Sequence, residues 1–237
     1  MNNLSKSGIK GRTGVIIQAR ISSTRLSGKI MLDLVGKTVL QHVIERCKKI
    51  NADEVIVATS TNKRDDIVEN FCKENDYSFY RGSEDDVLAR YFHCAKEFSL
   101  QNIVRITSDD PFIDYELINE MLKIYFNGDY DYVTNNIIRT LPYGLDCNIF
   151  SFSLLKYMFE NAKRDDEREH VTTYVLHNKN KFKIFNFKIK TDYSNYRLTI
   201  DTLDDYCKAY EIYMSIYPKN NFFLLSDIIK FLKKLEG

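Results

Sequence analysis

A stretch near the N-terminus gathers positive charge and hydroxyl groups. The segment QARISSTRLSGK, residues 18–29, follows the apolar run GVII and contains Arg20, Arg25 and Lys29 with no acidic residue. Arginine forks onto phosphate oxygens and lysine binds them as a point charge, so such a loop after a buried strand can hold a polyphosphate. A solvated basic loop explains the same residue types, and composition alone does not choose between the two interpretations.

Two aspartates follow apolar segments elsewhere in the chain. Asp109 stands in TSDDP after the run NIVRIT, and Asp201 ends YRLTID. Carboxylates at the carboxyl ends of strands can meet at one edge of a parallel sheet and bind Mg²⁺ through oxygen. The alternative is helix capping, because a predicted helix follows each aspartate. We expect Asp110 to be an exposed turn residue, and Asp204 and Asp205 to be acids of a first helical turn.

The common phosphate-binding motifs do not explain the basic loop. The tripeptide GKT occurs at residues 36–38, but the Walker A motif requires a glycine where this chain has Met31. The dinucleotide-binding fingerprint needs its glycines after the first strand, whereas Gly8, Gly11 and Gly14 precede or begin it. The loop therefore needs another explanation.

Composition limits the partners and the compartment. With 34 basic and 33 acidic residues among 237, the net charge of +1 provides no field for wrapping nucleic acid or lying on an acidic membrane. The N-terminal residues MNNLSKSGIKGR precede no apolar export segment, so we expect a cytoplasmic protein. The five cysteines form no CxxC pair and the four histidines no HxxxH pair, which indicates reduced thiols and disfavours structural zinc.

Alternating patterns predict an α/β fold. Short β-branched runs predict buried parallel strands at residues 14–19, 54–60 and 102–107. Apolar residues at helical spacing predict helices at 39–50, 63–75 and 86–98. The expected fold is Rossmann-like and GT-A-type, with a mostly parallel sheet covered by helices on both faces.

The second half of the chain changes rhythm. From about residue 131, runs such as YDYVTNN, LDCNIFS and FKIFNFKIK predict strands of a mixed kind with helices near 151–161 and 168–178. We expect an inserted mixed α+β subdomain at about 131–190 that leaves the main sheet. Residues 196–201 should return as a strand before helices at 203–216 and 222–235. The predicted organisation is thus a flexible tail at 1–13 and one domain at 14–237.

Seven ordered motifs identify a resemblance. The runs IIQARISSTRLSGKIML, ATSTNKRDD, YRGSEDDVLARY, RITSDDPFID, YGLDCNIFS, REHVT and RLTIDTLDD resemble the SpsF-like branch of the cytidylyltransferases, relatives of the CMP-Kdo and CMP-sialic acid synthetases. The resemblance implies use of CTP and Mg²⁺, and transfer of CMP to a Kdo-like octulosonate or nonulosonate with release of pyrophosphate. The activated sugar acid would serve surface polysaccharide synthesis. The resemblance also implies a homodimer formed through the inserted region.

The resemblance assigns residues to CTP and to the metal. It implies that Arg25, Lys29, Asp109 and Asp201 are catalytic and that the two aspartates bind Mg²⁺. Serine replaces the family's proline in RLSGK, so the loop loses a fixed φ angle at Ser27. The residues expected to contact CTP are Gln18, Ala19, Arg20, Ser22, Ser23, Arg25, Lys29, Gly82, Ser83 and Thr107.

The acceptor residues come from the second half of the chain. The resemblance places Arg168 and His170 at the acceptor's carboxylate and Asp146 at its hydroxyls, although a lone histidine on a helix is often structural. Residues 84–86 fit either a nucleotide contact or the first turn of a helix. A GT-A-type glycosyltransferase and a non-catalytic nucleotide-binding relative are the alternative functions. The three cations of the loop favour a triphosphate over a nucleotide sugar.

Overall fold

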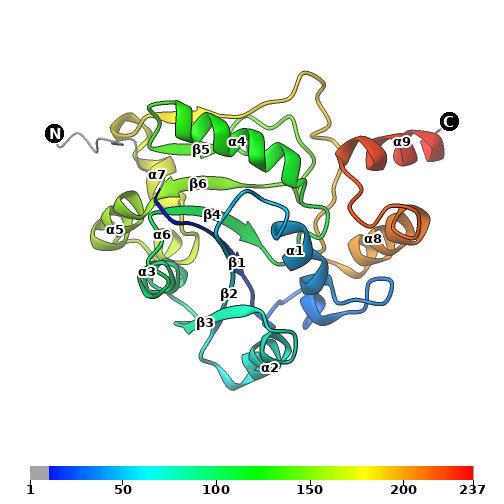
Figure 1. Cartoon of the computed structure of the whole chain (residues 1–237), viewed down its shortest axis with the longest axis horizontal. Helices are drawn as coiled ribbons and strands as arrows, with labels where there is room; N and C mark the ends of the chain where they lie inside the picture. The colour runs from blue at the N-terminus through cyan, green and yellow to red at the C-terminus, as the bar shows by residue number, and fades with distance from the viewer. Residues whose placement is uncertain (1–10, 237) are drawn as a thin grey trace.

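The computed structural model describes residues 11–236, which form one seven-stranded sheet with helices on both faces (Figure 1). The strand order is β3-β2-β1-β4-β6-β5-β7. The predicted tail at 1–13 lies mostly outside the described residues, although Thr13 already belongs to the first strand. The Rossmann-like, mostly parallel architecture expected from the sequence is confirmed.

Four parallel strands form one half of the sheet. Three of them, β1, β2 and β4, have β-branched and apolar interiors, and both faces of β1 and β4 are largely buried, as the unbroken apolar runs predict. Their carboxyl ends therefore lie along one edge of the sheet, where open α/β folds place their ligands. The strands are β1 (Thr13–Gln18), β2 (Glu54–Ser60), β3 (Ser78–Gly82) and β4 (Asn102–Thr107).

The region 131–190 extends this same sheet and does not leave it, contrary to our expectation. Strand β6 (Asn148–Ser151) pairs antiparallel with β4 and with β5 (Tyr132–Thr134), and β7 (Ile184–Asn186) pairs parallel with β5. Only β6 runs against the other strands. Its antiparallel register brings Asn148 beside Arg105 of β4 near the carboxyl edge.

Two cores hold the helices on the two faces of the sheet. One core contains buried residues of α1, α2, α4, α8 and α9 together with Val15 and Ile17 of β1. The other contains buried residues of α3, α5 and α7 together with Ile16 of β1. In Figure 1, α8 and α9 lie at one side of the molecule, and α3, α5 and α6 at the other. The helices are α1 (Val39–Cys47), α2 (Asp66–Glu74), α3 (Val87–Glu97), α4 (Tyr115–Asn127), α5 (Phe152–Asn161), α6 (Asp165–Glu169), α7 (Thr173–His177), α8 (Leu203–Ile216) and α9 (Leu225–Glu236), with 3-10 turns η1 (Lys29–Met31), η2 (Lys63–Asp65) and η3 (Lys179–Lys181).

The strand predicted at 196–201 is wrong. The segment makes only an isolated bridge between Tyr143 and Arg197. It runs extended across the sheet edge, since Leu198 N donates to Tyr143 O (2.7 Å) and Ile200 N donates to Asp109 O (2.9 Å). Both side chains are buried, so the alternation typical of a strand is present without a neighbouring strand. This crossing places Asp201 next to the end of β4.

None of the helices described in residues 11–236 has the length and apolarity needed to cross a lipid bilayer.

Candidate active site

The basic loop is closed by a left-handed glycine. Gly28 has φ 70°, and its N–H donates to Ile21 O (3.1 Å), which ties the two ends of the loop together. A side chain at this φ angle adds backbone strain, so glycine is the favoured residue for the turn. The next residue, Lys29, opens the turn η1, whose Ile30 is buried in the core. The Lys29 backbone is thereby anchored while its side chain reaches the sheet edge.

Lys29 joins the two aspartates singled out from the sequence. Its Nζ donates to Asp109 Oδ2 at 2.7 Å and to Asp201 Oδ1 at 2.8 Å. Because both oxygens contact one nitrogen, they lie no more than 5.5 Å apart. Burial alone would lower the pKa of Lys29, but the two carboxylates outweigh it and raise the pKa above the usual lysine value. Lys29 is therefore a permanent cation at this position.

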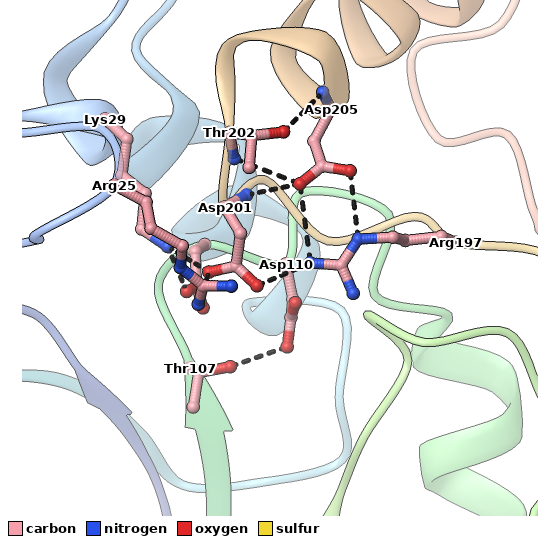
Figure 2. Close-up of polar contacts among 9 residues, drawn as sticks. Arg25, Lys29, Thr107, Asp110, Arg197, Asp201, Thr202 and Asp205 are labelled. Carbon is pink, nitrogen blue, oxygen red and sulfur yellow. Dashed lines mark hydrogen bonds and ion pairs between the residues drawn. The ribbon is translucent and has the colours of Figure 1, made fainter.

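Asp201 carries two further cations, shown in Figure 2. Arg25 pairs with its Oδ1 at 2.9 Å, and Arg197 donates to its Oδ2 at 2.5 Å and to Asp205 at 2.9 Å. Burial would raise the pKa of Asp201, but hydrogen bonds from Lys29 and Arg197 and the charges of Lys29 and Arg25 lower it below the usual value. Asp201 is thus a fully ionised carboxylate with both oxygens occupied.

Neither aspartate caps a helix. Asp114 caps α4 by accepting from Glu116 N and Leu117 N, and Thr202 caps α8 by accepting from Asp205 N. The capping interpretation of Asp109 and Asp201 is therefore wrong, and their carboxylates are free to face the basic loop. As predicted, Asp205 lies in the first turn of α8; its side chain also accepts from Thr202 N to complete a capping box.

Asp110 differs from our expectation. We predicted an exposed turn residue, but only 4% of Asp110 is exposed, and its carboxyl accepts a 2.5 Å hydrogen bond from Thr107 Oγ1. The turn after β4 points this side chain inward beneath the site. Burial, and then the charge of neighbouring Asp109, raise the pKa of Asp110 to about 8. Thr107, predicted to contact CTP, is held by this contact at the end of β4.

The start of the basic loop is clamped by two acids. Buried Asp65 accepts from Ile21 N at 2.7 Å, and Glu84 accepts from Ser22 Oγ at 3.2 Å. Arg20 donates to the backbone carbonyl of Glu84 at 3.0 Å. These contacts place the loop against the turn that follows β3, the turn in which Ser83 was predicted to face the nucleotide.

The remaining predicted nucleotide residues lie along the same edge. Ala19 N donates to Ala58 O, and Gln18 Oε1 accepts from Arg105 at 3.3 Å. Ser23 is half-buried at the loop surface.

The turn after β3 depends on an arginine that sequence reasoning missed. Fully buried Arg90 donates to Ser83 O at 2.6 Å. A Cβ added at Gly82 would lie 2.9 Å from Arg90 Cγ, so the glycine leaves room for the arginine stem. Ser83 Oγ accepts from Asp86 N, and Asp86 caps α3. Residues 84–86 thus lead into α3, as the helix interpretation expects, and Glu84 also contacts the basic loop.

Asp146 lies in a second polar group of the region 131–190. Arg139 binds it with two hydrogen bonds of 2.5 and 2.9 Å and lies 4.0 Å above the ring of Tyr143, whose exposed fraction is 48%. Gly144 follows with φ 100°; a Cβ there would meet Thr199 N at 2.4 Å. This loop is therefore pressed against the segment that carries Asp201. Sequence reasoning selected Asp146 but not Arg139.

Arg168 and His170 lie elsewhere. Arg168 donates to the Asp86 carboxylate and to Phe159 O at 2.9 Å, so it links α6 to the start of α3 and to α5. His170 ends α6 and is exposed. The three predicted acceptor residues do not cluster: Asp146 pairs with Arg139 beside the Asp201 segment, whereas Arg168 sits behind the turn after β3.

The pair of aspartates fits Mg²⁺ that arrives with a phosphate ligand. Mg²⁺ in proteins is bound through one or two carboxylates, with substrate oxygens and water completing its shell. Asp109 and Asp201 supply two such carboxylates within 5.5 Å of each other. Among residues 11–236, no group of three or more His, Cys, Asp or Glu side chains could hold a metal. Two carboxylates would leave positions in the Mg²⁺ shell for phosphate oxygens and water.

Arg197 was also missed, although it stands four residues before Asp201 in a quoted motif. The spacing suggests an ordinary helical ion pair, but the segment is extended, and only its crossing of the sheet edge turns the guanidinium toward both Asp201 and Asp205. No local sequence signal separates this arginine from an exposed one.

A mostly parallel sheet with a cationic loop and an acid pair at its carboxyl edge is the arrangement expected of a nucleotidyltransferase. The model of the family described as Cytidylyltransferase matches residues 14–235, and the chain belongs to this family. The family resemblance found in the sequence is thereby confirmed. The chain is also 32% identical to the spore coat polysaccharide biosynthesis protein SpsF of Bacillus subtilis, over 81% of this chain and 82% of that protein.

Solved structures agree with the assignment. A cytidylyltransferase from Leptospira borgpetersenii matches with a TM-score of 0.90 and 37% identity over 95% of both chains. A CMP:2-keto-3-deoxy-manno-octonic acid synthetase complexed with CTP matches with a TM-score of 0.67 over 86% of this chain and 99% of that chain. Its identity of 17% shows a shared fold alone.

Proposed function

We propose that the protein transfers CMP from CTP to a sugar acid and releases pyrophosphate. The observation that carries the proposal is the convergence of Lys29, Asp109 and Asp201 within hydrogen-bonding distance in a member of the cytidylyltransferase family. The name of a similar protein, the spore coat polysaccharide biosynthesis protein SpsF, supports a product destined for a surface polysaccharide, and the family resemblance of the motifs supports a sugar acid as acceptor.

The nucleotide half of the site would work as follows. Arg25 and Lys29 bind the terminal phosphates of CTP through charge-assisted hydrogen bonds. Asp109 and Asp201 hold Mg²⁺, which neutralises negative charge on the phosphates when it is bound. The other contacts to CTP come from the loop and the neighbouring strand ends, through Gln18, Ala19, Arg20, Ser22, Ser23, Gly82, Ser83 and Thr107.

The reaction is a direct displacement at the α-phosphorus. The acceptor's hydroxyl oxygen forms the new P–O bond in line, while the bond to the bridging oxygen breaks and pyrophosphate leaves with the electron pair. The hydroxyl proton passes to water. Lys29 and Arg25 stabilise the charge that develops on the leaving group, so the chain contributes positioning and electrostatics and needs no covalent nucleophile.

For the acceptor we retain Asp146, Arg168 and His170 and add Arg139. The Arg139 guanidinium next to the exposed Tyr143 suits a planar carboxylate, and Asp146 suits hydroxyl groups. We also propose, from the resemblance, a homodimer that works in the cytoplasm. A glycosyltransferase and a non-catalytic relative are the less favoured functions, because the chain belongs to a nucleotidyltransferase family.

Pyrophosphate release tests the proposal. The protein is incubated with Mg²⁺, one of CTP, UTP, ATP or GTP, and a panel of octulosonates and nonulosonates. We expect release only with an accepted sugar acid and in the order CTP, then UTP, then the purines, because a pocket built for a pyrimidine excludes larger bases. Equal turnover with ATP would contradict the base assignment, and release from none of the acids would contradict the substrate class.

A further inference from the structure

The proposed metal ligands and the proposed phosphate ligands bind each other in the described structure. Three cations face three carboxylates. Lys29 contacts Asp109 and Asp201, and Arg25 contacts Asp201. Arg197 contacts Asp201 and Asp205. Each oxygen of Asp201 and Oδ2 of Asp109 already has a positively charged partner. Mg²⁺ therefore cannot take its place on Asp201 while these pairs remain intact.

The charge of the incoming ligand determines whether it can separate the ion pairs of Asp109 and Asp201. The cluster has as many cations as carboxylates, because Asp205 also pairs with Arg197, so a bare divalent ion would meet no net negative charge in a partly buried site. A triphosphate has the opposite sign and offers Lys29 and Arg25 a stronger partner. Moving these cations to phosphate would free the carboxylates for the metal.

We propose that Lys29 occupies the metal's place in the nucleotide-free protein, so that nucleotide and metal bind as one cooperative pair. The inference rests on the proposed function for the identity of the metal and the nucleotide. It assigns Lys29 two positions: between the aspartates before binding, and on the phosphates afterwards. Coupling of this kind is reciprocal, so each ligand strengthens the binding of the other.

Lys29 is the main barrier and Arg25 a minor one. The Lys29 side chain is 9% exposed and bridges both carboxylates, whereas that of Arg25 is 61% exposed and touches only Asp201. Exposed ion pairs contribute little because water and salt screen them, and buried ones resist disruption. Removing the two charges should therefore affect metal binding to different degrees.

Mn²⁺ binding without nucleotide tests the inference. Mn²⁺ prefers the same oxygen ligands as Mg²⁺, and electron paramagnetic resonance measures its free concentration directly. We expect Lys29→Met to bind Mn²⁺ at least about ten-fold more tightly than the unaltered protein, and Arg25→Met to show a smaller gain, because the competing charges are removed. Lys37→Met is the matched control, since Lys37 pairs with Glu45 and should leave Mn²⁺ affinity unchanged.

Two further measurements keep the outcome decisive. Lys29→Met leaves two carboxylates without their shared cation, so it should melt at a lower temperature and recover on addition of Mn²⁺. Adding Asp201→Asn to Lys29→Met should abolish the gained affinity. If neither Lys29→Met nor Arg25→Met binds Mn²⁺ more tightly than the unaltered protein, the inference is wrong.

Failure of the proposed function would give a different pattern. Since Mn²⁺ binding is measured without CTP or acceptor, a gain in Lys29→Met supports the inference even when the unaltered protein releases no pyrophosphate. Conversely, normal turnover of the unaltered protein, with no gain in Mn²⁺ affinity in the variants, would support the transferase assignment. It would contradict the inference that Lys29 occupies the metal's position before nucleotide binds.

Discussion

The loop at residues 18–29 and the loop at residues 136–146 lie on the same edge of the sheet but are held in different ways. The first is fixed by segments from across the chain: Asp65 binds Ile21 N, Glu84 binds Ser22, and Lys29 joins two distant aspartates. The second carries its main ion pair, Arg139–Asp146, within itself. Its ties to other segments are mostly hydrogen bonds of backbone groups, with Asn186 and the stretch 189–198 as partners.

This difference indicates which residues of the site can change without disturbing the rest. A loop tied to four other segments cannot change one contact without moving the rest, which suits groups that must meet a triphosphate in a defined geometry. Arg139 and Asp146 pair within one loop that is held separately by Asn186 and Ile189, so these two side chains can change while the loop stays in place. The nucleotide half should therefore govern turnover, and the acceptor half the choice of substrate.

The largest effect should come from the acid pair. Asp109→Asn and Asp201→Asn should each fold normally and lose turnover by about two orders of magnitude or more, because a charge on the reacting centre is lost. The assay is pyrophosphate release with CTP. The matched control is Asp204→Asn, an exposed residue in the first turn of α8, which should retain full activity. If both variants remained active, the conclusion that the nucleotide half governs turnover would be wrong.

Stability of the nucleotide half should depend on pH through His42. Burial lowers the pKa of His42 to about 4, although a hydrogen bond to Leu34 O opposes the shift. The unfolded chain takes up this proton near pH 6.5, so the free energy of unfolding should fall by up to about 3 kcal/mol as pH decreases from 6.5 to 4. Urea unfolding at several pH values measures this dependence. The free energy of unfolding should change less with pH in His42→Gln than in the unaltered protein, and as much as in the unaltered protein in His170→Gln.

Removing Lys29 or Arg25 from the basic loop should have similar effects on catalysis but different effects on the stability of the protein. Lys29→Ala and Arg25→Ala should each weaken CTP binding and turnover by about 1–3 kcal/mol, as expected for charge-assisted contacts. Arg25→Ala should leave the melting temperature nearly unchanged, since this side chain is largely exposed. Lys29→Ala should lower it, because two partly buried carboxylates lose their bridge. CTP titration and thermal melts separate the effects; equal melting temperatures would argue against the bridge.

The smallest effects should separate two arginines of the second half. Arg139→Ala should raise the apparent KM for the sugar acid by about ten-fold and leave that for CTP unchanged, because one charged contact is lost. Our sequence-based prediction gives Arg168→Ala the same acceptor phenotype, but its bond to Asp86 favours a defect in CTP binding or stability instead. Steady-state kinetics in both substrates decides between these outcomes and shows whether Arg168 belongs to the nucleotide half.

The sheet and the cationic loop could be predicted because their signals are local. Apolar runs, helical spacing and a glycine in a turn report on a few neighbouring residues, and β1, β2 and β4 formed close to their expected bounds. The strand at 196–201 failed for a physical reason: alternating burial of Leu198 and Ile200 mimics a strand when a segment crosses packed loops. The burial of Asp110 likewise depends on the direction of a single turn.

The residues that can do chemistry could be recognised from the sequence alone, and so could the strand ends that carry most of them. The sequence determined the family as well, since the motifs keep their order along the chain. The tertiary structure decided which of these groups meet. Lys29 reaches Asp109 across 80 positions and Asp201 across 172, while Arg168 turns toward Asp86. Such pairings follow from strand order and packing, because residues this far apart in the chain are brought together only when the whole sheet has formed.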